Sequence, residues 1–156
     1  MTSPSTSISI LLARLAGTQV CFPASAVREL VRSVAIAPLP GAPGVIEGAI
    51  NLHGRIVPVV NLRQRLELPG VPNSPAQFLI ILETSDRLIA IRVDDVDDVT
   101  DISTSDFESP SAISPVLQRL SGVAATANGA LVIYDADAFL TQAERDALDE
   151  AESVTA

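Results

Sequence analysis

The sequence has no lysine and no tryptophan, and among its 156 residues it has one cysteine and one histidine. A single cysteine excludes an internal disulfide framework and is typical of a reducing compartment. Cys21 stands beside Phe22 in an apolar run, which predicts a buried thiol. Catalysis by a nucleophile and a base usually relies on histidine, and His53 is the one candidate. Because it stands beside turn residues, we interpret it as a hydrogen-bonded turn residue rather than as a general base. One histidine and one distant cysteine are too few ligands for a zinc site.

Long apolar runs are missing as well. No run approaches the roughly 20 residues that a membrane-spanning helix requires. The N-terminus is polar and uncharged, and it lacks the basic start and the cleavage site of a signal peptide. Residues 1–7 are predicted to form a disordered tail. We therefore expect a cytoplasmic protein with no direct membrane insertion, which reaches a membrane only through a partner.

The net charge of −9 is distributed unevenly along the chain. Residues 1–75 carry six arginines and three glutamates, whereas residues 76–156 carry four arginines and sixteen acids. Binding of nucleic acid requires a basic face that neutralises phosphates. This balance predicts no nucleic-acid partner and makes the mildly basic first half the better candidate for binding an acidic protein.

Short runs of valine, isoleucine and leucine between turn residues indicate a mostly β protein. The three prolines of segment 69–75 mark the strongest boundary in the chain. We predict one domain over residues 8–150, made of a first barrel (about 8–69), a linker (about 69–76), a second barrel (about 77–135) and a C-terminal helix (about 136–152). Asn128-Gly129 predicts a hairpin turn, and Thr141 with Glu144 predicts a capping box at the start of the helix.

Five aspartates lie within one short segment: Asp94, Asp95, Asp97, Asp98 and Asp101. Such a density invites a calcium site, but an EF-hand loop needs a glycine at its sixth position. Val93, Val96 and Val99 instead interleave the acids as they would in a strand. The spacing therefore favours a solvated acidic edge, which resists edge-to-edge aggregation.

Three stretches, taken in order, carry a family resemblance. Val27 to Leu30 reads VREL before a proline-rich loop, Val45 to Arg63 reads VIEGAINLHGRIVPVVNLR, and Ile89 to Val96 reads IAIRVDDV. Together they resemble the CheW-like domain family, whose core reads approximately hydrophobic-x-G-x-x-N-L-R-G-x-I-x-P-V-x-D-L-R. The resemblance runs from about Ile8 to Leu148, and the chain looks like a stand-alone member of the family.

The resemblance implies a fold and a function. The fold is mostly β, with two small five-stranded SH3-like β-barrels packed across a shared hydrophobic interface, short helices and a C-terminal helix. Members of the family have no enzymatic activity, no cofactor and no metal. They are adaptors of bacterial chemotaxis, a two-component system, and they couple chemoreceptors (methyl-accepting chemotaxis proteins) to the CheA histidine kinase. The implied partners are the regulatory domain of the kinase and the cytoplasmic tip of the receptors, in membrane-bound arrays.

Carried over position by position, the resemblance also implies binding residues. Those expected to bind the receptor are Val27, Glu29, Gly48, Asn51, His53, Phe78, Ala90 and Val99. Those expected to bind the kinase are Val45, Ile56, Val57 and Pro58. Glu29 is the strongest candidate, because packing does not explain a lone acid in an apolar strand. For the other receptor-binding positions, a role in the backbone conformation or in the core is the alternative.

Three residues depart from the family pattern: His53 replaces an arginine, Asn61 a usual aspartate, and Asp95 a frequent glycine. The first change removes a permanent positive charge. Either His53 pairs with Glu29 in place of that arginine, or Arg55, two residues along the same strand face, supplies the charge. The departures leave open a CheW-like scaffold of another chemosensory pathway, such as surface sensing or development. A small-ligand-binding barrel or an enzyme is the third alternative.

Overall fold

The computed structural model describes residues 7–103, 107–108, 120–126 and 129–155. The tail expected over residues 1–7 lies outside these ranges except for Ser7, which begins the first strand. Asn128 of the expected hairpin turn also lies outside them. The prediction of a mostly β protein is confirmed, since the described residues form two sheets and few helices.

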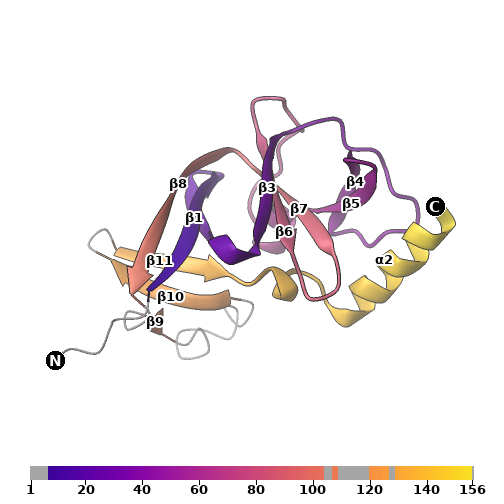
Figure 1. Ribbon diagram of the computed structural model, residues 1–156. Coiled ribbons are helices and arrows are strands. Elements are labelled where there is room, and N and C mark those ends of the chain that lie inside the picture. The colour runs from indigo at the N-terminus through magenta and orange to yellow at the C-terminus, as the bar shows by residue number, and fades with distance from the viewer. Residues whose placement is uncertain (1–6, 104–106, 109–119, 127–128, 156) are drawn as a thin grey trace.

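The two sheets divide the strands between the two sides of the molecule (Figure 1). The first sheet has the spatial order β8 (Asp95–Ser103), β1 (Ser7–Leu15), β2 (Thr18–Pro23), β11 (Gly129–Tyr134), β10 (Leu120–Thr126) and β9 (Phe107–Glu108). The second has the order β3 (Val27–Arg32), β6 (Phe78–Glu83), β7 (Leu88–Val93), β5 (Arg55–Val60) and β4 (Ile46–Leu52). Short 3-10 turns (Ala24–Ala26 and Ala136–Phe139), helix α1 (Leu62–Arg65) and helix α2 (Gln142–Thr155) complete the described elements.

The predicted division into successive barrels over 8–69 and 77–135 is wrong. The first sheet takes strands from both ends of the chain, because β1 pairs antiparallel with β8 and β2 pairs parallel with β11. The second sheet is the middle of the chain, from β3 to β7. Segment 69–76 therefore does not link two barrels. It belongs to the loop that leads from α1 to β6, within the part of the chain that forms the second sheet. Turn residues mark where strands end, but they carry no information about which strands pair across long separations.

Apolar side chains form three clusters. One lies within the first sheet (Ile10, Cys21, Ile102, Ile133) and one within the second (Ile50, Val57, Val59, Leu79, Ile81, Ala90). The largest cluster joins the two sheets and includes Phe22, Tyr134 and Phe139, whose ring centroids lie 6.0–6.2 Å apart. The shared hydrophobic interface is thus present. Cys21 is buried as predicted, and burial raises the pKa of its thiol to about 11.

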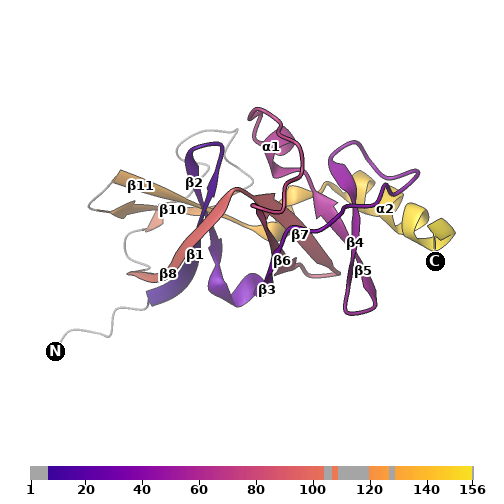
Figure 2. The ribbon, with the colours of Figure 1, turned by 90° about the horizontal axis from the view of Figure 1, so that it is seen from above.

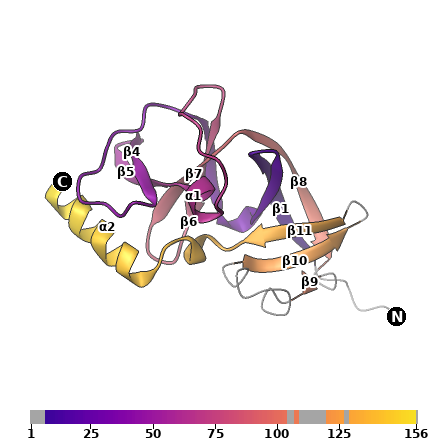
Figure 3. The ribbon, with the colours of Figure 1, turned by 180° about the vertical axis from the view of Figure 1, so that it is seen from behind.

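Helix α2 lies along the second sheet, at the end of the molecule away from β9–β11 (Figure 3). It begins with the predicted capping box: the Thr141 N–H donates to Glu144 Oε1 at 2.8 Å, and the Glu144 N–H donates to Thr141 Oγ1 at 3.1 Å. Leu148 and Ala151, two residues of this helix, are buried. Arg65 binds Glu144 at 2.7 Å and Arg87 binds Glu152 at 3.1 Å. Some of the acidic residues in the second half of the chain thus form ion pairs that hold this helix against the rest of the protein.

The aspartates of β8 lie on a strand that forms the edge of the first sheet. Asp95, Asp97, Asp98 and Asp101 are exposed, so the interpretation as an acidic edge is confirmed. Asp94 precedes the strand and differs from the others. Its carboxylate accepts hydrogen bonds from the side chains of Arg63 and Gln77 and from the Ala16 N–H at 2.8 Å.

Stability should fall in acid, because ion pairs hold several carboxylates in the folded state. Burial alone would raise the pKa of Asp94, but the hydrogen bonds from Arg63 and the Ala16 N–H leave that pKa below its ordinary value. The pKa values of Asp86 and Glu144 are lowered in the same way, by Arg145 and Arg65 respectively. Groups with a lowered pKa stabilise the fold above their unfolded pKa of about 4, and this stabilisation is lost as the pH falls through the folded pKa.

We therefore expect the free energy of unfolding, measured by urea titration, to be flat above about pH 5 and to decrease below about pH 4. Glu152 opposes this trend, because its burial raises its pKa more than Arg87 lowers it. Replacing Asp94 by asparagine should flatten the acid decrease. An unchanged acid profile in Asp94→Asn would show that this carboxylate does not contribute to it.

Candidate partner-binding surface

The candidate binding surface is centred on the β4–β5 hairpin (Figure 2). His53 and Gly54 connect the strands with φ angles of 52° and 86°. Positive φ at both positions is the signature of a type I′ turn, whose twist matches that of the strands it joins. The Asn51 side chain supports the turn, because its Oδ1 accepts the Gly54 N–H at 2.8 Å.

The turn places His53 beside β3. His53 Nε2 lies 3.0 Å from Glu29 Oε1 and 3.3 Å from Oε2. Of the two alternatives for the partner of Glu29, the structure shows His53 rather than Arg55. The side chains of His53 and Glu29 are 76% and 37% exposed. An exposed pair contributes at most about 1 kcal/mol to stability, so Glu29 remains accessible to a partner at little cost to the fold.

Gly48 has a structural reason to be glycine. Its φ is 154°, and a Cβ there would overlap the carbonyl oxygen of Ala37 and lie 2.8 Å from Cγ2 of Ile36. The close approach comes from a short bridge in which Ala37 and Ala49 exchange backbone hydrogen bonds at 2.9 and 2.8 Å. Of the two roles considered for Gly48, the structure supports the conformational one.

The eight residues expected to bind the receptor do not all meet. Glu29, Asn51 and His53 gather at the β4–β5 turn beside β3.

The other expected receptor-binding residues lie away from this turn or inside the protein. Val27 and Phe78 are half-buried, and the Arg32 guanidinium lies 4.7 Å from the centre of the Phe78 ring. Ala90 is fully buried inside the second sheet, so it cannot contact a partner directly. Val99 is 51% exposed but lies on β8 of the other sheet.

The residues expected to bind the kinase are mostly core residues. Val45 and Val57 are 5% and 1% exposed, and Pro58 is buried. The expectation that these three side chains contact a partner is wrong, because they pack inside the protein. Ile56 is the exception at 51% exposed, and it pairs directly with Asn51 across the hairpin. One hairpin thus presents a residue from each of the two expected sites.

Three other exposed apolar side chains were not among the predicted site residues: Leu30, Val34 and Val71. Leu30 lies between the exposed Arg28 and Arg32 on β3, so the two-residue period of the strand could have revealed it. Nothing in the local sequence signals Val34 or Val71. Asn61, a departure from the family pattern, keeps a structural role because its Oδ1 caps helix α1 by accepting the Gln64 N–H at 3.1 Å.

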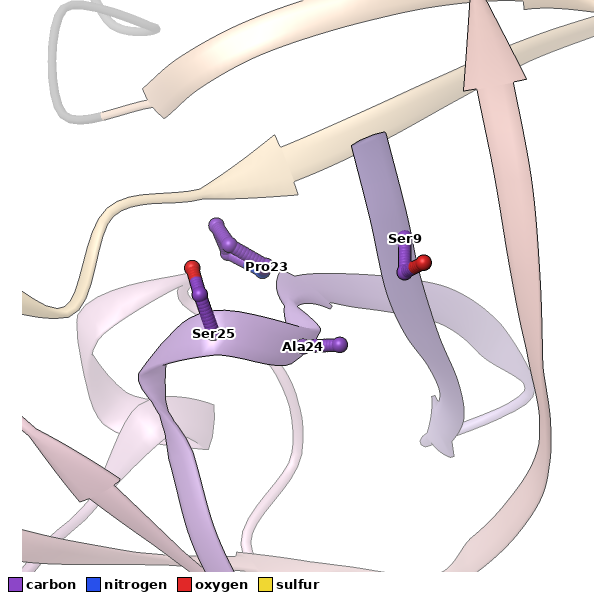
Figure 4. Close-up of a pocket in the computed structure, with 4 residues that line it drawn as sticks. All are labelled: Ser9, Pro23, Ala24 and Ser25. Atoms are coloured by element: carbon purple, nitrogen blue, oxygen red, sulfur yellow. The ribbon is translucent and has the colours of Figure 1, made fainter. Parts of the chain in front are cut away.

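The pocket in Figure 4 is lined by Ser9, Pro23, Ala24 and Ser25, none of which is an acid, a base or an activated nucleophile. The described residues contain no group of three histidine, cysteine or acidic side chains placed to hold a metal ion. They also contain no helix that is long and apolar enough to cross a membrane.

Known proteins resemble most of this chain in sequence and in fold. Residues 9–144 match the model of the CheW-like domain family. The chemotaxis protein CheW of Rhizobium meliloti is 26% identical over 136 residues, covering 86% of this chain and 88% of that protein. The CheW of Bacillus subtilis is 33% identical over 104 residues, covering 65% and 67%. The crystal structure of the scaffolding protein TtCheW from Thermoanaerobacter tengcongensis superposes with a TM-score of 0.79 at 26% identity, covering 89% of this chain and 96% of that one.

Proposed function

This chain belongs to the CheW-like domain family, and from that membership we propose that it is a non-catalytic adaptor of bacterial chemotaxis. It couples the cytoplasmic tips of chemoreceptors to the regulatory domain of a CheA-type histidine kinase, and it reaches membrane-bound receptor arrays through these partners. The observation that carries the proposal is the superposition of 89% of the chain on a scaffolding protein. The relatives named above are chemotaxis proteins, which favours this pathway over surface sensing or development.

The chemistry of the surface supports binding rather than catalysis. The buried Cys21 has a pKa of about 11 and is a poor nucleophile at neutral pH. A general base contacts a nucleophile or a bound substrate. The exposed side chain of His53 is instead hydrogen-bonded to the carboxylate of Glu29. In the proposed adaptor, Glu29 and His53 form the receptor-facing surface, and Asn51 positions the turn that brings them together. Ile56 belongs to the kinase-facing surface.

The proposal predicts that Glu29→Gln weakens receptor binding without unfolding the protein. A hydrogen bond to a charged group is worth about 1.5–3 kcal/mol when its partner is removed, so we expect a loss of affinity of about tenfold or more. Stability should change by less than about 1 kcal/mol, because the Glu29–His53 pair is exposed. Isothermal titration of a purified receptor tip into wild-type and variant protein measures this loss.

Glu83→Gln is the matched control. Glu83 forms a comparable exposed pair with Arg28, at 3.0 Å, on the neighbouring strand β6. We expect this variant to bind the receptor tip as the wild type does. Equal affinity in Glu29→Gln and the wild type would remove Glu29 from the receptor surface. Equal losses in both variants would show that only the overall charge matters.

A further inference from the structure

The loop of residues 69–75, which we call the proline loop, is held at its first half by two buried cations. Arg63 Nη1 donates to the carbonyl oxygen of Pro69 at 3.1 Å, and Arg92 Nη2 donates to that of Val71 at 3.0 Å. The two arginines are 5% and 7% exposed, and they are balanced by Asp94 and Glu47. Buried charged groups need hydrogen-bond partners, and the two loop carbonyl groups are among the partners of these arginines, so the backbone of the loop is held at both points.

The second half of the loop is fixed by amide and hydroxyl groups. The Ser74 N–H donates to Gln77 Oε1, and the Gln77 N–H donates to the Ser74 carbonyl, both at 3.0 Å. Asn73 Nδ2 donates to the Val34 carbonyl oxygen at 2.8 Å, which ties the loop to the chain after β3. The segment predicted to be a linker is therefore an ordered loop with polar anchors along its length.

This ordered loop presents an uncharged apolar surface. Residues 69–73 and Pro75 are exposed, and residues 68–77 contain no ionisable side chain. Val71 is 39% exposed, and Val34, to which Asn73 is anchored, is 49% exposed. A groove that accepts this surface has no charge to satisfy, which argues against phosphorylated or nucleic-acid partners.

The backbone of the loop suits one mode of recognition. Pro69 and Pro72 stand three residues apart, which is the repeat of a polyproline II helix, and the proline ring fixes φ close to the value of that helix. A polyproline II backbone makes no internal hydrogen bonds. The N–H groups of Gly70, Val71 and Asn73 donate to no other group in the part of the chain that the structure describes.

We propose that the proline loop is a docking ridge for a protein that offers a groove lined with aromatic side chains. Such grooves bind preformed polyproline II segments, because the ligand loses little conformational entropy. The anchors from Arg63, Arg92 and Asn73 supply this order before the partner arrives. The ridge shares no residue with the Glu29–His53 surface, so it goes beyond the proposed adaptor function and does not depend on it.

The test uses the full-length protein labelled with ¹⁵N and, as probes, an isolated SH3 domain and an isolated WW domain, whose grooves have the required chemistry. We expect either probe at millimolar concentration to shift the amide resonances of Gly70, Val71, Asn73 and Val34 selectively. The variant Pro69→Ala/Pro72→Ala should lose these shifts while the rest of its spectrum stays that of the wild type.

Pro40→Ala, which changes an exposed proline outside the loop, is the matched control and should keep the shifts. The proposal would be overturned if neither probe shifted the loop resonances. It would also be overturned if Pro69→Ala/Pro72→Ala responded as the wild type does, because the prolines would then not form the bound ridge.

Discussion

Val57→Asp should abolish cooperative folding, whereas Ile56→Asp, one residue earlier, should fold normally. Val57 is 1% exposed and packs with Ile50, Leu79 and Ala90 inside the second sheet. A carboxylate there has no partner and costs about 4 kcal/mol or more, which approaches or exceeds the lower end of the stability of native proteins, about 5–15 kcal/mol. Ile56 is 51% exposed, so its replacement should cost no more than about 1 kcal/mol.

Thermal unfolding followed by circular dichroism separates the two variants, and binding of the kinase regulatory domain gives the functional readout. The folded Ile56→Asp variant should lose kinase affinity if the hairpin carries part of that surface. A Val57→Asp protein as stable as the wild type would contradict the assignment of this strand face to the core. An Ile56→Asp protein that binds the kinase with undiminished affinity would remove Ile56 from the proposed surface.

Gly48→Ala is expected to have the second-largest effect, a loss of about 3 kcal/mol or more in the free energy of unfolding. The added Cβ would overlap the Ala37 carbonyl oxygen, which is a backbone atom and cannot move away without breaking the Ala37–Ala49 bridge. The φ of 154° adds conformational strain. Chemical denaturation monitored by fluorescence or circular dichroism measures this loss.

Gly54→Ala provides the comparison in the same hairpin. Gly54 also has a positive φ, 86°, but a Cβ there would meet no atom within 4 Å. Its replacement should cost only the strain of a left-handed residue, about 1–2 kcal/mol. If Gly48→Ala were no more destabilising than Gly54→Ala, close packing against Ala37 would not be the reason for this glycine.

Features set by neighbouring residues could be predicted from the sequence. The capping box of Thr141 and Glu144 and the turn at His53 and Gly54 both formed where local patterns placed them. The family pattern narrows the partner of Glu29 to two alternatives, His53 and Arg55, and the structure is needed to choose His53.

Features set by distant residues could not be predicted. The pairing of β1 with β8 joins strands more than 80 residues apart, and no local signal specifies it. The same holds for Arg63 and Arg92, whose acidic partners are 31 and 45 residues away. The inward or outward direction of Ile56 and Val57 depends on how β5 is placed in its sheet, and a shift of one residue would exchange the two faces.

The proposed adaptor binds a receptor tip and a kinase regulatory domain at the same time. Sedimentation velocity of the full-length protein mixed with both purified partners tests this directly. The proposed function predicts a single boundary with the mass of the ternary complex, reduced to the kinase binary complex by Glu29→Gln. If the receptor tip displaced the kinase domain, or if neither partner co-sedimented with the protein, the chain would not be an adaptor between them.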